Sequence, residues 1–403
     1  MELTKEEILQ EHLGGKLSVE LKKKLEDQKD LSIAYTPGVA KVCLEIKDNS
    51  DSVYDYTIKK NSVAVVTDGT AVLGLGDIGP RASIPVMEGK AVLFKRFGKI
   101  DSWPVPLENV RLENGKTDAK KVIEAVKQIS CLYGGINLED IAAPACFEIE
   151  ETLERDLEIP VFHDDQWGTA IIVLAAIKNY CILSEKKIEE IKIVVNGAGA
   201  AGIRICDMLK NAGAQNLFLV DSKSVVTISR TDLNPYKQKH ARETNLQTLS
   251  EIIQDANVFI GVSVADCLTK EMVQTMNDFP AIFAMANPNP EITPEEVKEA
   301  LGDKSYVMAT GRSDYPNQIN NVLGFPYIFR GALDAKARNI TMKMKIAASE
   351  ALAELARDEF IPEEVKQAYQ REFKFGKDYI IPTPFDPRLL EKVGGAVKGA
   401  VEK

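Results

Sequence analysis

Short apolar runs alternate with helical patterns in the second part of the chain. From about residue 190 these runs read, in order, KIVVNG, NLFLVD, NVFIGVS, AIFAMANP and YVMATG. Near-continuous hydrophobic runs of this length, separated by stretches with helical spacing, are typical of strands that helices cover on both faces. The pattern therefore predicts five buried strands in a doubly wound parallel sheet.

The first ~160 residues show a different pattern. They open with Lys- and Glu-rich segments whose apolar positions recur at helical spacing. A strand-like SVAVVTDGT (62–70) follows, and after a glycine-rich turn comes a further strand-like run, AVLFKRF (91–97). KTDAKKVIEAVKQIS (116–130) is an amphipathic helix, and TAIIVLAAI (169–177) and KIAASEALAELARDE (345–359) predict two more helices.

The change of pattern also predicts how the domains are divided. A chain of 403 residues exceeds one typical domain, so two domains with separate sheets are expected. We predict the α/β fold class, with an N-terminal α/β substrate and metal domain at residues 1–160. Residues 161–403 are expected to form a nucleotide-binding domain with a C-terminal helical tail, and the active site to lie in the cleft between the two.

Composition narrows the range of partners and compartments. The net charge of −10 makes a nucleic-acid backbone an unsuitable partner. The longest apolar run stops at Lys178, too early to span a bilayer, and the N-terminus is too charged for a signal peptide. The 6 cysteines form no CxxC pair, which argues against structural zinc and for reduced thiols. We expect a cytoplasmic protein that binds neither membrane nor nucleic acid.

A glycine-rich motif stands directly after the first of the five runs. Its residues are the candidate pyrophosphate loop: Gly197, Ala198, Gly199, Ala200, Ala201 and Gly202. In a Rossmann-type unit the glycines allow a tight turn, close approach of the pyrophosphate and close helix–strand packing. The next run ends in Asp221, placed to accept the ribose hydroxyls and repel a 2′-phosphate, which favours NAD over NADP. Lys223 lies near enough to weaken that repulsion, so NADP remains the alternative cofactor.

Acidic residues gather at three places in the sequence: Glu139–Asp140, Asp164–Asp165 and Asp77. Two or three carboxylates from separate loops supply the oxygen ligands that Mg²⁺ or Mn²⁺ prefers. His163 stands beside one pair, but with 3 histidines and no HxH or HExxH spacing it is expected to be a packing residue. An oxygen-only metal site is therefore predicted.

Eight motifs, in order and over essentially the whole chain, resemble those of the short bacterial-type malic enzymes. They are AYTPGVA (34–40), VTDGTAVLGLGDIGP (66–80), PVMEGKAVLFK (85–95), NLEDIAAPACFEIE (137–150), FHDDQWGTA (162–170), GAGAAG, ANPNPEI (286–292) and GRSDYPNQINNVLGFPYIFRGALDAKA (311–337). The resemblance implies oxidative decarboxylation of (S)-malate to pyruvate and CO₂, with reduction of NAD or NADP and a requirement for Mg²⁺ or Mn²⁺. It also implies a homodimer with the N-terminal helices as contacts.

The resemblance further assigns catalytic roles to Tyr35 and Lys90. Lys90, as a neutral amine, would take the proton of the malate C2 hydroxyl, and Tyr35 would protonate the enolpyruvate. A lysine with an ordinary pKa of ~10.4 is a poor base at neutral pH, so burial or a neighbouring positive charge is expected to lower it. Asp164 is expected to orient or tune Lys90 without touching the metal, and Lys95 is the rival for the base.

By the same resemblance the metal ligands match Glu139, Asp140 and Asp165. Asn287 and Asn321 match asparagines that contact the substrate and the nicotinamide end of the cofactor. One departure is clear: Ala71 stands where animal-type members carry a substrate-binding arginine. Arg81 is the replacement candidate, on the basis of its proximity in sequence.

Two alternatives remain open. A metal-dependent oxaloacetate decarboxylase would keep the acidic site and omit the redox step, but it would need no dinucleotide loop. A catalytically silent NAD-binding sensor would need neither Tyr35 nor Lys90. Retention of the loop and of both catalytic candidates favours the malic enzyme interpretation.

Overall fold

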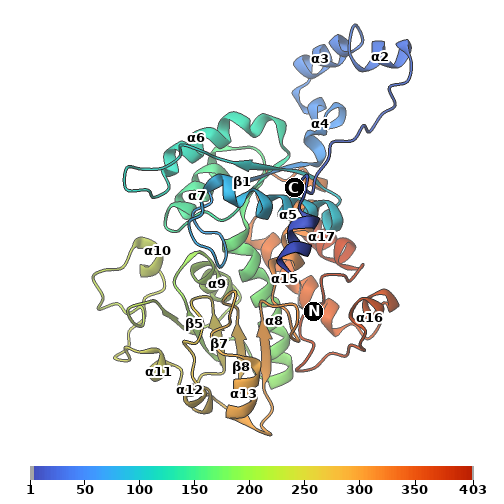
Figure 1. The fold of residues 1–403 in the computed structure, drawn as a ribbon. Coiled ribbons are helices and arrows are strands. Elements are labelled where there is room, and N and C mark those ends of the chain that lie inside the picture. Colours follow the sequence, from blue (N-terminus) through green and yellow to red (C-terminus); the bar gives the residue numbers. More distant parts are fainter. Residues whose placement is uncertain (1–3, 402–403) are drawn as a thin grey trace.

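The computed structural model describes residues 4–401, which form two parallel sheets surrounded by helices (Figure 1). The first sheet has the order β2-β1-β3-β4. Its strands are β1 (Ser62–Thr67), β2 (Asp101–Pro106), β3 (Gly135–Leu138) and β4 (Val161–His163). The second sheet has the order β6-β5-β7-β8-β9. Its strands are β5 (Lys192–Asn196), β6 (Asn216–Val220), β7 (Val258–Gly261), β8 (Ala281–Ala284) and β9 (Val307–Thr310).

The second sheet confirms the five strands expected from the apolar runs, and every pairing in it is parallel. The strand order reverses between β5 and β7, since β6 lies on one side of β5 while β7, β8 and β9 follow on the other. In open α/β sheets such a reversal opens a crevice beyond the carboxyl ends of the strands, where ligands bind. The glycine-rich loop follows β5 directly and so lies at this crevice.

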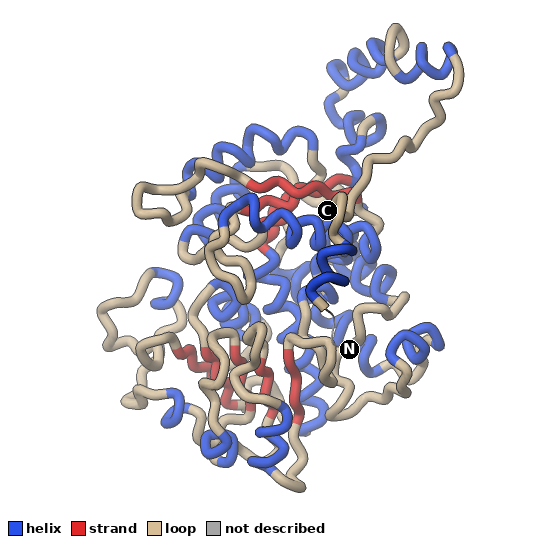
Figure 2. Tube along the Cα trace, in the orientation of Figure 1, coloured by secondary structure: helices blue, strands red, loops and turns tan. Residues whose placement is uncertain are grey.

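Seven helices precede β4 in the described chain (Figure 2). They are α1 (Lys5–Glu11), α2 (Gln28–Ala34), α3 (Val39–Asp48), α4 (Val53–Tyr56), α5 (Gly79–Gly98), α6 (Ala119–Ile129) and α7 (Ala145–Asp156), with short 3-10 turns η1 (Ser50–Ser52), η2 (Ile58–Asn61) and η3 (Ser130–Leu132). The strand expected at AVLFKRF (91–97) is wrong, because these residues are the end of α5. Met87, Ala91 and Phe94 are buried at a spacing of three to four, so the apolar run is one side of a helix.

The later helices surround the second sheet and return to the first. They are the π-helical turn η4 (Asp164–Gly168), α8 (Thr169–Ser184), α9 (Ala200–Asn211), α10 (Pro235–Gln238), α11 (Leu249–Ile252), α12 (Lys270–Gln274), α13 (Pro294–Leu301), η5 (Asn321–Leu323), α14 (Phe325–Asp334), α15 (Met342–Arg357), α16 (Glu363–Tyr369) and α17 (Leu389–Gly399). The expected helices at 116–130, 169–177 and 345–359 correspond to α6, α8 and α15.

α8 joins the two halves. By length and composition Asp164–Ser184 would be long and apolar enough to cross a membrane, but 67% of its most apolar window is buried inside the protein. It packs against α9 and α15, and a single hydrophobic core runs from the first sheet through α8 to the second. α8 is therefore the central core helix, and its apolar character reflects burial on all sides.

The C-terminal helices pack on the N-terminal half, since α14 contacts both α5 and α17. The domain boundary after residue 160 stays a prediction. The last strand of the first sheet, β4, begins at Val161, just after it.

The segment that carries α2 and α3 departs from this arrangement. Both helices project from the body, away from α5 (Figure 1). We call residues 27–48 the arm. None of its side chains is buried.

Candidate active site

Lys90 lies on the buried face of α5, at the centre of an acidic cluster. Its side chain is 8% exposed. The Nζ atom lies 2.8 Å from Oε1 of Glu139 and donates a hydrogen bond to Oδ2 of Asp164 at 2.7 Å. The same amine lies 4.4 Å from the centre of the Phe325 ring at the start of α14. Two carboxylates and an aromatic face thus fix the position of the predicted base.

The parallel strands β3 and β4 bring the predicted metal ligands together. Glu139 and Asp140 directly follow β3, and Asp165 is the second residue after β4. All three therefore lie at one edge of the first sheet. One oxygen of each of the three carboxylates lies within 4.8 Å of the others. The backbone N–H of Asp140 donates to Oδ2 of Asp165 at 2.7 Å, and Asp140 has a left-handed φ of 53°. Aspartate is among the few residues other than glycine that adopt this left-handed region regularly.

This cluster has the properties of a cation site. Burial and mutual repulsion raise the pKa of Glu139 to about 7 and that of Asp140 to about 9. Burial also raises the pKa of Asp165 to about 6. Oδ2 of Asp140 and Oδ1 of Asp164 are buried without a hydrogen-bond partner among the described residues. Three convergent carboxylates with an unsatisfied oxygen suit a hard divalent cation such as Mg²⁺ or Mn²⁺.

The charge around Lys90 differs from the sequence-based expectation. Burial lowers the pKa of Lys90, as expected, but the negative charges of Asp164 and Glu139 outweigh burial, and the net pKa is raised. The expectation considered a cation and the burial of the amine, and it let Asp164 tune Lys90, but it did not count the negative charges of Asp164 and Glu139 against the neutral amine. With the protein groups alone, the amine is therefore held in its charged form.

Asp164 behaves as the neighbour of Lys90 that the sequence suggested. Burial raises its pKa to about 7, while its contacts with Lys90 and Asn321 act in the opposite direction. A Cβ on Gly168 would lie 2.0 Å from Oδ1 of Asp164, so only glycine leaves room for this side chain. The sequence interpretation had not identified Gly168, although it stands three residues after Asp165 in the same motif.

Other candidates are placed outside the cluster. Burial lowers the pKa of His163 to about 3, so its ring is neutral and packed, as predicted. Asp77 forms a two-pronged pair with Arg111, at 2.9 and 3.0 Å. Arg81 pairs with Glu108 and its side chain is 85% exposed, which gives no support to a role in substrate binding.

The glycine-rich loop has the geometry that a pyrophosphate site needs. Gly197 has a φ of 122°, and a Cβ there would lie 2.5 Å from the carbonyl oxygen of Val262. A Cβ on Gly202 would lie 1.7 Å from the carbonyl oxygen of Gly197, so strand and helix pack directly against each other. No atom lies within 4 Å of the Cβ position of Gly199 at the head of α9. That open space faces the N-terminal end of a helix, which favours an anion.

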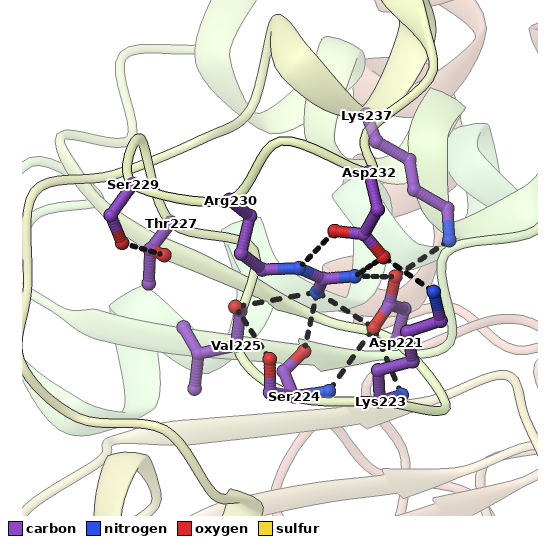
Figure 3. A network of polar contacts seen from close by, with 9 residues as sticks. All are labelled: Asp221, Lys223, Ser224, Val225, Thr227, Ser229, Arg230, Asp232 and Lys237. Carbon is purple, nitrogen blue, oxygen red and sulfur yellow. Dashed lines mark hydrogen bonds and ion pairs between the residues drawn. The ribbon is translucent and has the colours of Figure 1, made fainter.

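Asp221 ends β6 as expected, but its carboxylate is already paired (Figure 3). Arg230 donates to both of its oxygens, at 2.8 and 3.0 Å, and Lys237 donates at 2.7 Å. Burial alone would raise the pKa of Asp221, but these bonds outweigh burial and hold it well below its usual value. Lys223 instead pairs with Asp232. Since the acid faces two cations, its repulsion of a 2′-phosphate is weaker than the sequence implied.

The loops after β7 and β8 are fixed by a residue that the sequence interpretation missed. Glu291 is fully buried and accepts hydrogen bonds from the backbone N–H groups of Ser263 and Ala286, both at 3.0 Å. This places Asn287 at the carboxyl edge of the second sheet, with Gly311 beside its amide. Glu291 was recognisable only as part of the ANPNPEI motif.

A second overlooked network connects the metal edge with the dinucleotide helix. Arg204 of α9 donates to the side chain of Gln166 at 2.9 Å and lies over the Trp167 ring. Glu150 of α7 accepts from the indole of Trp167 at 3.0 Å and from the backbone of His163 at 2.7 Å. The turn that carries Asp164 and Asp165 is therefore fixed by contacts with α7 of the N-terminal half and with α9 of the second half.

Tyr35 is the one predicted catalytic residue that the structure does not bring into the cluster. It caps the C-terminal end of α2 in the arm, and its side chain is 69% exposed. Lys90, Glu139, Asp140, Asp164 and Asp165 lie together in the body.

Comparisons with known proteins match both halves of the chain. A family model described as the malic enzyme N-terminal domain matches residues 14–154, and one described as the malic enzyme NAD-binding domain matches residues 167–366. A Bacillus subtilis protein named bifunctional malic/malolactic enzyme is 51% identical over 96% of this chain and 90% of its own length. The chain belongs to the malic enzyme family.

Other members of the family carry different cofactor names. A probable NADP-dependent malic enzyme of Rickettsia prowazekii is 52% identical over 95% of this chain, which spans 49% of that protein. An NAD-dependent malic enzyme of Thermotoga maritima has a similar structure, with a TM-score of 0.87 at 42% identity, over 99% of this chain and 100% of that one. The chain thus spans about half the length of some relatives and nearly all of others. Family membership leaves the choice between NAD and NADP open.

Proposed function

We propose that this chain oxidatively decarboxylates (S)-malate to pyruvate and CO₂, with NAD as hydride acceptor and a divalent metal held by Glu139, Asp140 and Asp165. The observation that carries the proposal is the buried cluster of Lys90 with these carboxylates at the carboxyl edge of one parallel sheet, next to the dinucleotide crevice of the other. Family membership supports the same reaction. The relatives' names supply the substrate class.

In the proposed reaction Lys90 accepts the proton of the C2 hydroxyl while hydride leaves C2. Asp164 keeps the amine in position through its 2.7 Å bond. When bound, the metal would polarise the C2 oxygen and compensate the carboxylate charge that raises the pKa of Lys90. Tyr35 would then donate a proton to C3 of the enolpyruvate, and Asn287 and Asn321 would orient substrate and nicotinamide.

A single assay tests this proposal. Malate, NAD and Mn²⁺ should together give NADH and pyruvate in equal amounts, and omission of the metal should abolish both. Consumption of oxaloacetate without any malate-dependent NADH would instead identify the oxaloacetate decarboxylase. Binding of NAD without either activity would instead favour the sensor function. Either of these two outcomes would refute the proposal.

The cofactor preference can be tested at the Asp221 cluster. We propose that NADP is also accepted, because Arg230 and Lys237 offset the charge of Asp221. Replacing Arg230 and Lys237 together by alanine should raise KM for NADP more than KM for NAD. As a matched control, Arg242→Ala removes a cation that bonds a backbone oxygen of Gln215, and it should change both values alike.

We also propose a cytoplasmic location and a homodimer. All 6 cysteines are free, as a reducing compartment requires. The N-terminal helices are the proposed contacts of the dimer.

A further inference from the structure

The loop between β9 and η5 connects the two asparagines that we assign to substrate and nicotinamide. We call its residues 311–320 the β9 loop. At its start, the Cβ position of Gly311 lies 3.2 Å from Nδ2 of Asn287. At its end, the chain continues into Asn321, which contacts Asp164. The position of this loop therefore affects both asparagines.

A cavity of about 210 Å³ lies between the β9 loop and the C-terminal segment at residues 369–384. Asn317 of the loop joins the two sides. Its side-chain amide donates to the carbonyl oxygen of Lys377 at 2.7 Å, and its side-chain oxygen accepts from the N–H of Ile380 at 2.8 Å. The same amide donates to the carbonyl oxygen of Met308 in β9 at 3.0 Å. The cavity is thus built from two segments that are held to each other and to the second sheet.

Tyr379 brings an unpaired polar group to this cavity. The residue lines the cavity and is 3% exposed, and its hydroxyl is buried without a hydrogen-bond partner among the residues that the structure describes. Burial raises the pKa of Tyr379, so the phenol keeps its proton and can donate a hydrogen bond. A buried hydroxyl without a partner is destabilising, and a ligand that accepts from it removes that cost. Thr383 adds a second hydroxyl to the wall.

The unpaired charge at the cavity is positive. Arg371 lines it, and the guanidinium lies 4.4 Å from the centre of the Phe373 ring, with no carboxylate of the described chain paired to it. Asp314 is the acidic residue among those that line the cavity, and it is already paired with Arg312, at 2.9 and 2.6 Å. A free guanidinium and a phenol hydroxyl are both donors, and together they suit a carboxylate.

Apolar side chains form another part of the wall and limit what can enter. They are those of Pro316, Ile381, Pro382 and Pro384. At ~30 Å³ per water molecule in the liquid, the volume of about 210 Å³ corresponds to roughly seven waters, which is too small for a nucleotide. The size and the lining fit a carboxylate that carries a short aliphatic chain.

We propose that this cavity is an effector site for a short-chain aliphatic monocarboxylate, with the carboxylate on Arg371 and Tyr379 and the chain against the apolar wall. The bound ligand joins the β9 loop to the C-terminal segment and so holds Asn321 in place. Because Asn321 is a proposed substrate contact, the ligand increases the affinity for malate, and this part of the inference rests on the proposed function.

Ligand-observed NMR with butyrate and the full chain tests the site. We expect saturable binding of butyrate that malate does not displace. Tyr379→Phe removes the hydroxyl, keeps the ring and breaks no hydrogen bond of the hydroxyl in the described chain, and it should weaken butyrate binding by about fivefold. Arg371→Gln should weaken it by more than about tenfold, because a charged hydrogen bond is lost. Arg338→Gln changes an exposed arginine that bonds the backbone oxygen of Arg155, and as the matched control it should bind butyrate like the wild type.

Malate turnover tests the effect on the active site. At saturating Mn²⁺ and NAD, butyrate should lower KM for malate severalfold and leave kcat nearly unchanged. Arg371→Gln should lose this response and keep the turnover that the wild type shows without butyrate. Butan-1-ol, which has the chain without the charge, and inorganic phosphate, which has the charge without the chain, should not replace butyrate.

Several results would overturn the inference. They are absence of butyrate binding, displacement of butyrate by malate, equal affinity in wild type and Arg371→Gln, and a KM for malate that butyrate does not change. Binding of butan-1-ol or phosphate as tight as that of butyrate would also overturn it. A wild-type chain that binds butyrate through Arg371 and Tyr379 but does not turn over malate would refute the proposed function and support the site, so the two failures are distinguishable.

Discussion

At the scale of single residues, the charge of the neighbours decides what Lys90 can do. The sequence places a lysine in the PVMEGKAVLFK motif, but the base needs a neutral amine, and the two carboxylates in contact with it stabilise the charged form. A cation bound to Glu139, Asp140 and Asp165 would compensate that negative charge. Proton transfer and metal binding are therefore expected to depend on each other at this site.

The role of the base gives the first prediction. Lys90→Ala should lower kcat for malate by roughly 10²–10⁴-fold, the usual contribution of a positioned base. Steady-state turnover with saturating Mn²⁺ and NAD measures the effect. Lys95 lies five residues later on the same helix, where it pairs with Asp101 and is 62% exposed, and Lys95→Ala should retain activity. An active Lys90→Ala variant beside an inactive Lys95→Ala variant would transfer the role to Lys95.

The metal site gives the second prediction. Asp165→Asn should weaken Mn²⁺ binding by more than about tenfold, because one of three charged ligands is lost. Calorimetric titration with Mn²⁺ in the absence of substrate measures it. Asp77→Asn removes a carboxylate that pairs with Arg111 outside the cluster, and it should bind Mn²⁺ like the wild type. Asp164→Asn should change turnover more than Mn²⁺ affinity; the opposite pattern would reverse the roles of the two aspartates.

At the scale of elements, the strands of the second sheet could be predicted because helices cover both of its faces. Burial on both sides leaves continuous apolar runs, and those runs appear in the sequence as five segments at the observed positions. The same kind of pattern led to the wrong prediction of a strand at residues 91–97. Seven mostly apolar residues within a longer helix resemble a buried strand. Its helical period appears only when the pattern is followed back to Gly79.

The candidate site was predictable where the ligands are local to a motif. Glu139, Asp140 and Asp165 follow strand ends in sequence and also in space. The partners of Asp221 were not predictable, because Arg230 and Lys237 come from a loop with no repeating pattern. The place of Tyr35 was not predictable either. The apolar spacing of α2 and α3 indicates helices, and spacing alone does not say which surface they cover.

The pyrophosphate loop gives the third prediction, through two glycines with different surroundings. Gly199→Ala should fold normally but bind NAD weakly, because its Cβ would enter only the open space at the head of α9. Gly202→Ala should destabilise the fold by about 1–3 kcal/mol, since its Cβ would meet the backbone of Gly197. Denaturant unfolding and NAD titration separate the two effects. Gly395→Ala in α17 meets no atom and serves as control for the substitution itself. Equal NAD affinity in Gly199→Ala and wild type would argue against pyrophosphate binding at this loop.

At the scale of the whole molecule, one hydrophobic core connects the two sheets with α14, α15 and α17, and the arm lies outside it. The body should therefore remain folded when the arm is altered.

The assembly gives the fourth prediction. Ile33→Asp places a charge on the exposed apolar surface of the arm and should convert the dimer into a monomer without malate turnover. Light scattering coupled to size exclusion measures the mass. Leu246→Asp changes a residue that is 37% exposed in the second half of the chain and should remain dimeric and active. A dimeric, active Ile33→Asp protein would show that the arm surface does not hold the subunits together.

The position of α8 has a consequence for biosynthesis. Residues 169–184 leave the ribosome early, yet α15, one of the helices that cover them, begins only at Met342, roughly 160 residues later. At a synthesis rate of ~5–20 residues per second, about 8–30 s pass between the synthesis of this apolar helix and the synthesis of α15, which packs against it. A nascent chain that stalls in this interval presents its most hydrophobic segment to water, to other chains and to chaperones. The core around α8 is thus completed only after α15 has been synthesised, and truncations before α15 should be insoluble.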